Sequence, residues 1–129
     1  MFNSIWYDTL NKPFLNPPSW IFSPVWTILY TTLIVSVILY SLGYTKENKL
    51  SGYVFFIIQL ILNLCWSPVF FGLHNIFLGL IIIIFMDIFA ILTAIKFFKV
   101  SKLAGSLLVP YIIWILFATY LNIAFLILN

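Results

Sequence analysis

The side chains most able to make specific contacts lie in an apolar stretch near the middle of the chain. Four of them share one helical face, at spacings of i, i+4, i+7 and i+8. They are Gln59, Asn63, Trp66 and Ser67. Amide, hydroxyl and indole groups at this spacing can join neighbouring helices by hydrogen bonds. They can also form the polar edge of a ligand cavity, and the spacing alone leaves both interpretations open.

Aromatic side chains recur at helical spacing in two further segments. Trp26 and Tyr30 are four residues apart. Another face consists of Tyr111, Trp114 or Ile115, Ala118, and Leu121 or Asn122. Aromatic stripes are often core packing, but interfaces between membrane helices favour small residues. Tryptophan in three segments therefore favours a cavity with flat walls, suited to a large planar apolar ligand with a few polar edge groups.

Residues capable of proton or metal chemistry are isolated from one another. Asp87 lies within an apolar segment, and the chain has no arginine to pair with it. A carboxyl group inside a membrane segment is a candidate functional group. It could serve a proton relay, bond to Thr93 or a backbone carbonyl, or lie at a subunit interface. His74, Met86 and Cys65 could ligate haem iron, but none has a second ligand at suitable spacing. We expect no metal site and no hydrolytic site.

Composition determines the class of protein. Of 129 residues, 64% are hydrophobic and 7% are charged, whereas soluble domains carry about 25% charged residues. This excludes a soluble globular monomer, a disordered chain and a nucleic-acid-binding domain. A single cysteine excludes a disulfide framework and a CxxC motif. The chain is therefore predicted to be an all-α integral membrane protein.

Charge-free stretches predict four membrane spans in one transmembrane domain covering residues 1–129. A spanning helix needs about 20 apolar residues, and the candidates are about 20–43, 51–71, 76–98 and 104–128. Ser23 and Pro24 read as an N-cap and first helical residue. Pro68 is expected to bend the second span, and Pro110 to lie near the start of the fourth.

The lysines predict the orientation. Lys46 and Lys49 lie between the first two spans, and Lys96, Lys99 and Lys102 between the last two. Both loops fall on one side, which the positive-inside rule makes cytoplasmic. The N- and C-termini are then expected on the non-cytoplasmic side.

The segment before the first span is rich in proline and tryptophan. Residues 6–30 contain four of the six prolines and three of the five tryptophans. An interfacial aromatic belt with a stiff loop would explain the tryptophans. A rigid aromatic lid over the outer mouth of the bundle also explains the spacing of Pro13, Pro17 and Pro18.

Three blocks resemble the TspO/MBR family, which comprises the tryptophan-rich sensory proteins of bacteria and the mitochondrial translocator protein. The blocks are residues 6–30, 63–72 (NLCWSPVFFG) and 109–122 (VPYIIWILFATYLN). The family has five transmembrane helices, and its first helix precedes the pair that corresponds to Trp6 and Tyr7. In this sequence only five residues precede that pair.

The resemblance implies a membrane receptor or sensor that binds porphyrin or haem as a ligand, with no cofactor required. Trp26 and Asn63 would donate hydrogen bonds to a ligand carbonyl. Carried over by position, the pocket residues would be Tyr7, Trp26, Tyr30, Asn63, Trp66, Trp114 and Ala118.

Further partners and activities follow from the same resemblance. Some bacterial relatives degrade protoporphyrin in light, and the matching catalytic tryptophans are Trp26 and Trp114. Some relatives bind sterols, but here no basic residue follows Tyr120, so that pattern is broken. A homodimer is expected, and Ala90 and Ala94 form one small-residue face for close helix packing. A small-molecule transporter is a third alternative, although the first span lacks the acidic residue that proton coupling needs.

Overall fold

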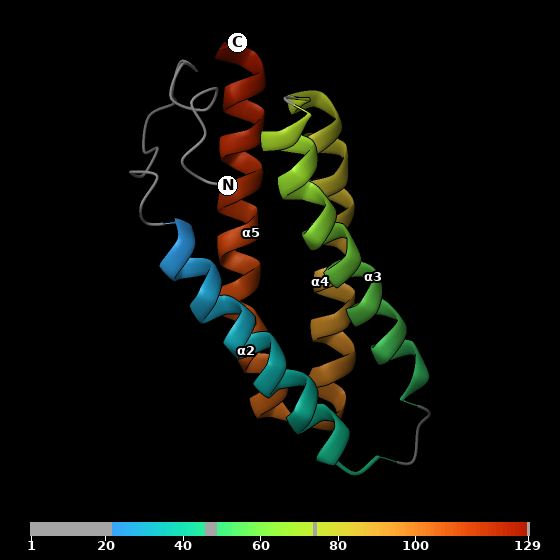
Figure 1. Ribbon diagram of the computed structural model, residues 1–129. Helices are drawn as coiled ribbons and strands as arrows, with labels where there is room; N and C mark the ends of the chain where they lie inside the picture. Colours follow the sequence, from blue (N-terminus) through green and yellow to red (C-terminus); the bar gives the residue numbers. More distant parts are fainter. Residues whose placement is uncertain (1–21, 46–48, 74, 129) are drawn as a thin grey trace.

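The computed structural model describes residues 22–45, 49–73 and 75–128, and within these ranges the regular elements are helices (Figure 1). They are α2 (Phe22–Leu42), α3 (Leu50–Ser67), the short π-helix η2 (Pro68–Gly72), α4 (Ile76–Val100) and α5 (Lys102–Leu128). In the described part of the chain, four helices are long and apolar enough to cross a membrane. The predicted all-α membrane bundle with four spans is confirmed.

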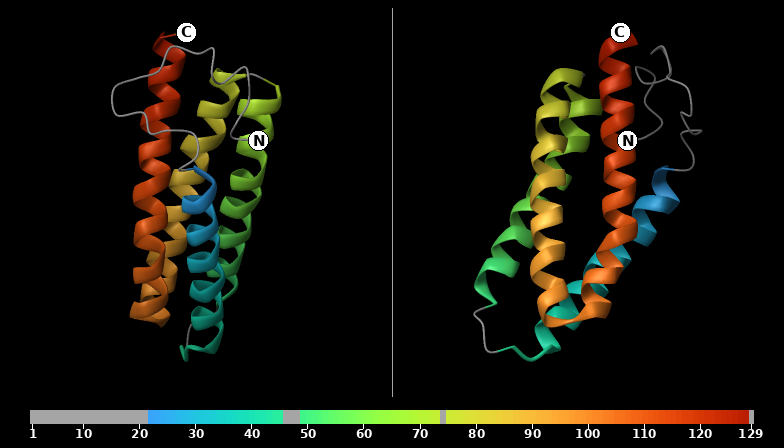
Figure 2. Two further views of the ribbon diagram at one scale, coloured as in Figure 1. Left: turned by 60° about the vertical axis from the view of Figure 1, so that its left-hand side comes forward. Right: turned by 180° about the vertical axis from the view of Figure 1, so that it is seen from behind.

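The bundle has two inner and two outer helices. α4 packs against both α5 and α3, whereas α2 packs mainly on α5, which it crosses obliquely (Figure 2). The end of α2, the start of α3 and the junction of α4 with α5 lie at the same end of the bundle (Figure 1). Lys49, which precedes α3, and the lysines near the junction, Lys96, Lys99 and Lys102, therefore share one end, as predicted, whereas Lys46 lies outside the described residues. The side of the membrane that this end faces stays a prediction.

Two predictions about the ends of helices are wrong. Ser23 lies within α2 (Phe22–Leu42), so it is not the N-cap and Pro24 is not the first helical residue. Pro110 lies inside α5 rather than near its start. The span predicted at about 104–128 otherwise agrees with α5 to within two residues, and the Ser101 hydroxyl accepts a hydrogen bond from the Ala104 backbone N–H (3.2 Å) at its first turn.

The second span changes its winding at Pro68. Because proline has no N–H, it cannot continue the α-helical bonding pattern, and the Leu73 N–H donates to the Pro68 carbonyl five residues back (3.0 Å). This π-helical turn occurs where the sequence predicted a bend. The next helix begins where the predicted span 76–98 begins, and the Asn75 side chain caps α4 by accepting a hydrogen bond from the Leu78 N–H (2.9 Å).

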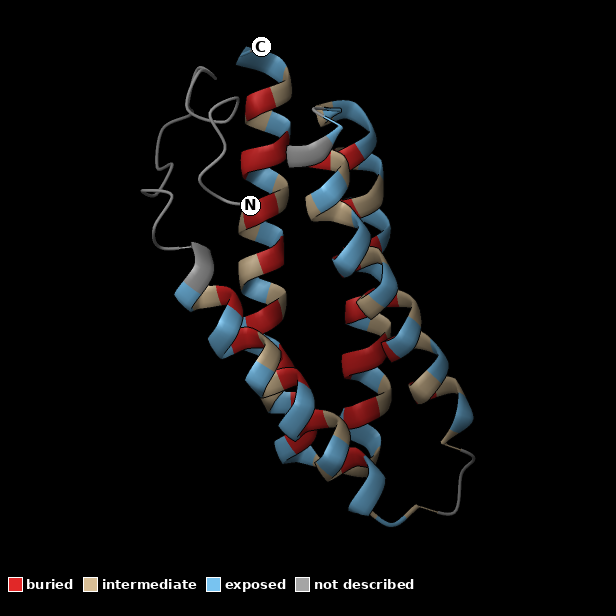
Figure 3. Cartoon of the chain, viewed as in Figure 1, coloured by how far each residue is buried: buried red, intermediate tan, exposed pale blue. Residues whose placement is uncertain are grey.

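Buried residues lie on the helix faces that point into the bundle, and exposed residues lie on the outer faces (Figure 3). Many of the exposed residues are large and apolar. Ile34, Ile57 and Ile113 are each more than half exposed, as expected for surfaces in contact with lipid. Ala90 and Ala94 are buried within the bundle. Their small side chains serve packing inside one copy of the chain, and the homodimer stays a prediction.

Candidate functional site

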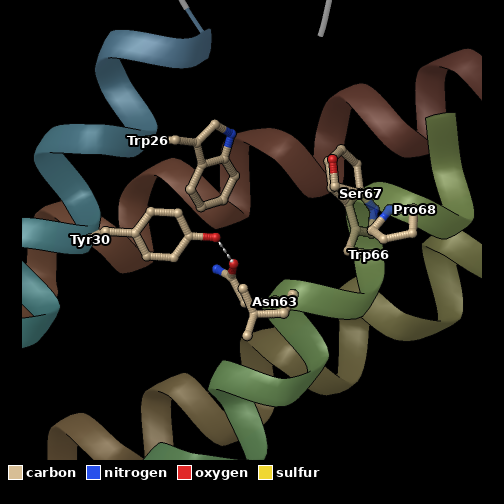
Figure 4. Close-up of a pocket in the computed structure, with 7 residues that line it drawn as sticks. Trp26, Tyr30, Asn63, Trp66, Ser67 and Pro68 are labelled. Carbon is tan, nitrogen blue, oxygen red and sulfur yellow. Dashed lines mark hydrogen bonds between the residues drawn. The ribbon is translucent and has the colours of Figure 1, made fainter. Parts of the chain in front are cut away.

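A small cavity lies between α2 and α3 near the π-helical turn, and we call it the chamber (Figure 4). Its volume is about 180 Å³. Its lining combines three aromatic rings with an amide and a hydroxyl group. The lining residues are Trp26, Tyr30, Asn63, Leu64, Trp66, Ser67 and Pro68. It therefore has mostly apolar walls with a few polar groups, which is the usual character of a small-molecule site.

Asn63 ties the chamber to a directional chain of hydrogen bonds. The Tyr30 hydroxyl donates to Asn63 Oδ1 (2.5 Å), and Asn63 Nδ2 donates to the Tyr111 hydroxyl (2.8 Å). Tyr111 in turn donates to Gln59 Oε1 (2.6 Å). Because Asn63 and Tyr111 each accept one of these bonds and donate the next, the bonds strengthen one another. The chain joins α2, α3 and α5 and fixes the orientation of Asn63.

The polar face of α3 was open to two interpretations, hydrogen bonding between helices and the edge of a ligand cavity, and its residues differ in which of these they fit. Gln59 is buried and bonds to α5, so it joins helices. Asn63 does the same and in addition lines the chamber. A side-chain amide carries two N–H donors, and Tyr111 uses one of those on Asn63 within the described part of the chain. Asn63 thus has a second donor for a ligand.

The aromatic residues that line the chamber pack against further aromatic rings. Trp26 lies against Tyr30, with ring centroids 5.8 Å apart. Trp114 meets Trp26 edge to face at 6.5 Å. Trp66 stacks on Phe70, with centroids 5.1 Å apart. These contacts fix the positions of the two indoles that line the chamber, Trp26 on α2 and Trp66 on α3.

The Trp66 indole is also held by a hydrogen bond. Its Nε1–H donates to Asn122 Oδ1 (3.0 Å), and Asn122 Nδ2 donates to the Ile76 carbonyl (2.9 Å) at the start of α4. Asn122 is itself buried. The start of α4 and the end of α5 together therefore orient one wall of the chamber.

Four of the predicted pocket residues come together, namely Trp26, Tyr30, Asn63 and Trp66. Trp114 stands behind Trp26, and Ala118 is buried in the core; neither lines the chamber. Tyr7 and the proline-rich segment 6–19 lie outside the described residues.

Sequence reasoning missed two features of the site. Pro68, the residue directly after α3, also lines the chamber, although the sequence predicted only a bend there. Tyr111 is the centre of the hydrogen-bond chain. Its place on the predicted face of the fourth span was the available signal, but its partners lie 48 and 52 residues away.

Asp87 occupies a separate place between α4 and α5. The Thr119 hydroxyl lies 2.6 Å from Asp87 Oδ2 and 2.8 Å from the Ile115 carbonyl. Among the described residues Asp87 Oδ1 has no hydrogen-bond partner. Thr93 is not the partner of Asp87, because its hydroxyl donates to the Phe89 carbonyl (2.7 Å) in its own helix. Asp87 does not line the chamber.

The haem-ligand candidates are also dispersed. Met86 is fully buried in the core, whereas Cys65 is exposed on α3. His74 lies outside the described residues. Neither Met86 nor Cys65 lines the chamber.

Comparison with known proteins gives one consistent result. The model of the TspO/MBR family matches residues 1–128. The chain is 47% identical to the tryptophan-rich protein TspO of Chlorobaculum tepidum, over 98% of this chain and 80% of that protein. It is 40% identical to the tryptophan-rich sensory protein of Cereibacter sphaeroides, over 91% of this chain and 72% of that protein. It is 35% identical to the human translocator protein, over 91% and 70%.

Proposed function

Because the chain belongs to the TspO/MBR family, we propose that this integral membrane protein binds a tetrapyrrole, or a similar planar hydrophobic ligand, at the chamber. One observation carries the proposal. Trp26 and Tyr30 from α2 converge with Asn63 and Trp66 from α3 on one cavity. Flat indole faces flank the space, and an amide with an unused N–H donor borders it.

The chamber residues have distinct roles in this proposal. Trp26 and Trp66 contact the faces of the ligand, where aromatic rings attract one another most strongly in offset or edge-to-face arrangements. Asn63 donates to a carbonyl or carboxylate at the edge of the ligand. The chamber is smaller than the usual range of about 300–1,000 Å³ for drug-sized ligands, so it holds one edge of the macrocycle.

The biological role that we propose is that of a receptor or sensor for tetrapyrroles, with transport as the alternative. The names of two relatives, a tryptophan-rich sensory protein and a translocator protein, refer to these two roles. The chamber supports binding in either case. Uptake of protoporphyrin into vesicles with and without a proton gradient separates a carrier from a receptor.

Titration with protoporphyrin IX in the dark tests the proposal. We expect saturable quenching of tryptophan fluorescence at one ligand per chain, together with a shift of the porphyrin absorption band. A hydrophobic linear amphiphile of similar mass serves as the control and should not compete. Quenching that rises without saturation would show partition into the bilayer instead, and would refute the proposal.

Light-driven porphyrin degradation is a second candidate function, favoured by the contact between Trp26 and Trp114. An excited porphyrin passes energy or electrons to dioxygen, and the reactive oxygen attacks electron-rich rings such as indole. Because Trp26 lines the chamber and touches Trp114, an indole oxidised at either position can exchange an electron with the other. The oxidised indole then takes an electron from the porphyrin and is restored. Dioxygen is thus the oxidant and is reduced through superoxide to hydrogen peroxide with protons from water, and the porphyrin is what loses the electrons.

A further inference from the structure

Asp87 lies near the middle of a membrane-spanning helix. It follows the start of α4 by 11 residues and precedes its end by 13, which places it about 17 Å and about 20 Å from the two ends of the helix. Its side chain is 8% exposed. A charged side chain is costly to bury at this depth, so a carboxyl group here needs either a positive partner or a proton.

The described residues offer Asp87 no positive partner. The lysines among them lie toward the end of the bundle where α4 meets α5, and they are Lys49, Lys96, Lys99 and Lys102. On α4 itself, Lys96 is about 14 Å further along the helix axis than Asp87. In the described part of the chain, the carboxyl group bonds to Thr119 through Oδ2, and Oδ1 has no hydrogen-bond partner.

The Thr119 hydroxyl is within hydrogen-bond distance of two acceptors. Its oxygen lies 2.6 Å from Asp87 Oδ2 and 2.8 Å from the Ile115 carbonyl oxygen. A threonine hydroxyl carries one hydrogen atom, so it can serve only one of these acceptors with a well-directed bond. The other contact needs a hydrogen atom from its own side, because two oxygen atoms at such a distance repel each other when no hydrogen lies between them.

Other hydroxyl groups in the spans indicate where the hydrogen atom of Thr119 goes. Four of them donate to the carbonyl four residues earlier in their own helix, at 2.7 to 2.9 Å, which is a recurrent arrangement for serine and threonine in helices. They are Thr31, Ser41, Thr93 and Ser106. The Ile115 carbonyl is likewise four residues before Thr119. Thr119 therefore donates to Ile115, and the hydrogen atom between Thr119 and Asp87 belongs to the carboxyl group.

We propose that Asp87 is a proton-binding site, in which Oδ2 carries a proton at neutral pH and donates it to the Thr119 hydroxyl. The hydrogen bonds then run in one direction, from Asp87 to Thr119 and from Thr119 to the Ile115 carbonyl. Oδ1 is the carbonyl oxygen of a neutral acid, and a neutral group without a partner costs less than a charged one. The proton thus joins α4 to α5 without burying a charge. This inference does not depend on the proposed function.

The titratable groups on the helices that pack on α4 are few. On α5 they are Tyr111, Tyr120 and Lys102, and on α3 they are Tyr53 and Cys65. The π-helical turn η2 contains none. Tyr111 lies close enough for a charge on Asp87 to act on its hydroxyl. A neutral Asp87 leaves Tyr111 and its hydrogen-bond chain undisturbed.

Infrared spectroscopy of the full chain in lipid nanodiscs at pH 7 tests the proposal, because a protonated carboxyl group has a C=O stretching band at higher frequency than a carboxylate. The chain has three carboxylic side chains, Asp8, Glu47 and Asp87. We expect this band in the wild type and its loss in Asp87→Asn. The matched controls Asp8→Asn and Glu47→Gln should keep the band. A wild-type spectrum without it, or a band that survives Asp87→Asn, would overturn the proposal.

Two variants of Thr119 test the direction of the bond and leave Asp87 intact. Thr119→Val keeps the shape of the side chain but removes the hydroxyl, so the O–H of Asp87 loses its acceptor. The C=O band should then move to higher frequency, as expected for a carboxylic acid that makes no hydrogen bond. Thr119→Ser keeps the hydroxyl and should leave the band where it is. An unshifted band in Thr119→Val would overturn the donation to Thr119.

A count of protons is a second measurement, and it does not depend on the infrared band. An aspartic acid in an unfolded chain has a pKa of about 3.9, so at pH 7 a protonated Asp87 must release its proton when the chain unfolds. With a pH-indicator dye in weakly buffered denaturant, the wild type should release one proton per chain more than Asp87→Asn. Equal release by the two proteins would overturn the proposal.

Discussion

The Tyr30 hydroxyl donates a 2.5 Å hydrogen bond to Asn63 Oδ1 and so connects α2 to α3. These two outer helices otherwise pack mainly on α5 and α4. Both residues line the chamber, and Asn63 continues the hydrogen-bond chain to Tyr111. The same contact therefore stabilises the bundle and shapes the site.

The energy of this contact is measurable by a double-mutant cycle of Tyr30→Phe and Asn63→Leu. Hydrogen bonds between membrane helices contribute about 0.6 kcal/mol on average and up to about 1.7 kcal/mol. We expect a coupling free energy in the upper part of this range, because the bond belongs to a chain of hydrogen bonds. Unfolding in mixed detergent micelles gives the free energies. Additive effects of the two changes would mean that the bond contributes nothing.

A matched control is Tyr53→Phe, which also removes one phenolic hydroxyl. Tyr53 forms its hydrogen bond with Ser41 (2.6 Å) at an exposed position, and neither residue lines the chamber. It should show no coupling to Asn63→Leu. Coupling of similar size would point to a general effect of losing a hydroxyl.

The tryptophan pair gives a prediction about light. The variant Trp26→Phe/Trp114→Phe keeps two aromatic rings in the same places but removes both indoles, which are more easily oxidised than a phenyl ring. We expect it to bind protoporphyrin IX in the dark with affinity within threefold of wild type and to lose light-driven porphyrin loss. Absorbance of the bound porphyrin under constant illumination provides the measurement, and degradation at the wild-type rate would remove both residues from that role.

Thr119 is predicted to stabilise the bundle through Asp87. Thr119→Val keeps the shape of the side chain but removes the hydroxyl that bonds to Asp87 Oδ2. Leaving a buried polar group without its partner costs about 1–3 kcal/mol, so the unfolding free energy should fall by that amount. In an Asp87→Leu background the same substitution should cost much less. Equal costs in the two backgrounds would contradict a Thr119–Asp87 interaction.

A proton relay through Asp87 is tested separately. If Asp87 exchanges a proton during ligand binding, the affinity for protoporphyrin IX depends on pH, and Asp87→Asn abolishes that part of the dependence. The measurement is a dark titration at several pH values for both proteins. Identical affinities at every pH, with unchanged folding, would exclude the relay.

Gly52 is predicted to be necessary for close packing of Tyr40. A methyl carbon at Gly52 would stand 2.6 Å from Tyr40 Cζ, and Tyr40 cannot easily move because its ring stacks on Phe97 at 4.1 Å. Overpacking of this kind costs about 1–3 kcal/mol. Gly52→Ala should lower the unfolding free energy accordingly, whereas Gly79→Ala, whose nearest neighbour would be at 3.2 Å, should cost less. The reverse order would contradict the packing.

The spans were predictable because they depend on local composition. An uncharged apolar stretch of about 20 residues is enough to indicate a membrane helix, and the four spans follow from it. The helical face of Gln59 and Asn63 was predictable for the same reason, since it depends only on spacing along one helix. Pro110 was misplaced because proline usually occurs in the first turn of a helix, whereas here it lies inside α5.

The partners across helices were not predictable. Whether Asn63 meets Tyr111 depends on which helix lies next to which, and the two residues are 48 positions apart. The same holds for Asp87, whose partner is Thr119 of another helix rather than Thr93 of its own. Spacing within a helix shows which residues share one face. The residues that this face contacts depend on how the helices pack in the bundle.

The central claim is that Asn63 at the chamber wall contacts a tetrapyrrole, and one comparison of affinities tests it most directly. Asn63→Leu and Gln59→Leu each remove a buried amide from the same hydrogen-bond chain, but only Asn63 lines the chamber. The dissociation constant for protoporphyrin IX in the dark should rise at least tenfold in Asn63→Leu, equivalent to about 1.4 kcal/mol, and stay within threefold of wild type in Gln59→Leu. Equal affinities in all three proteins would contradict the claim.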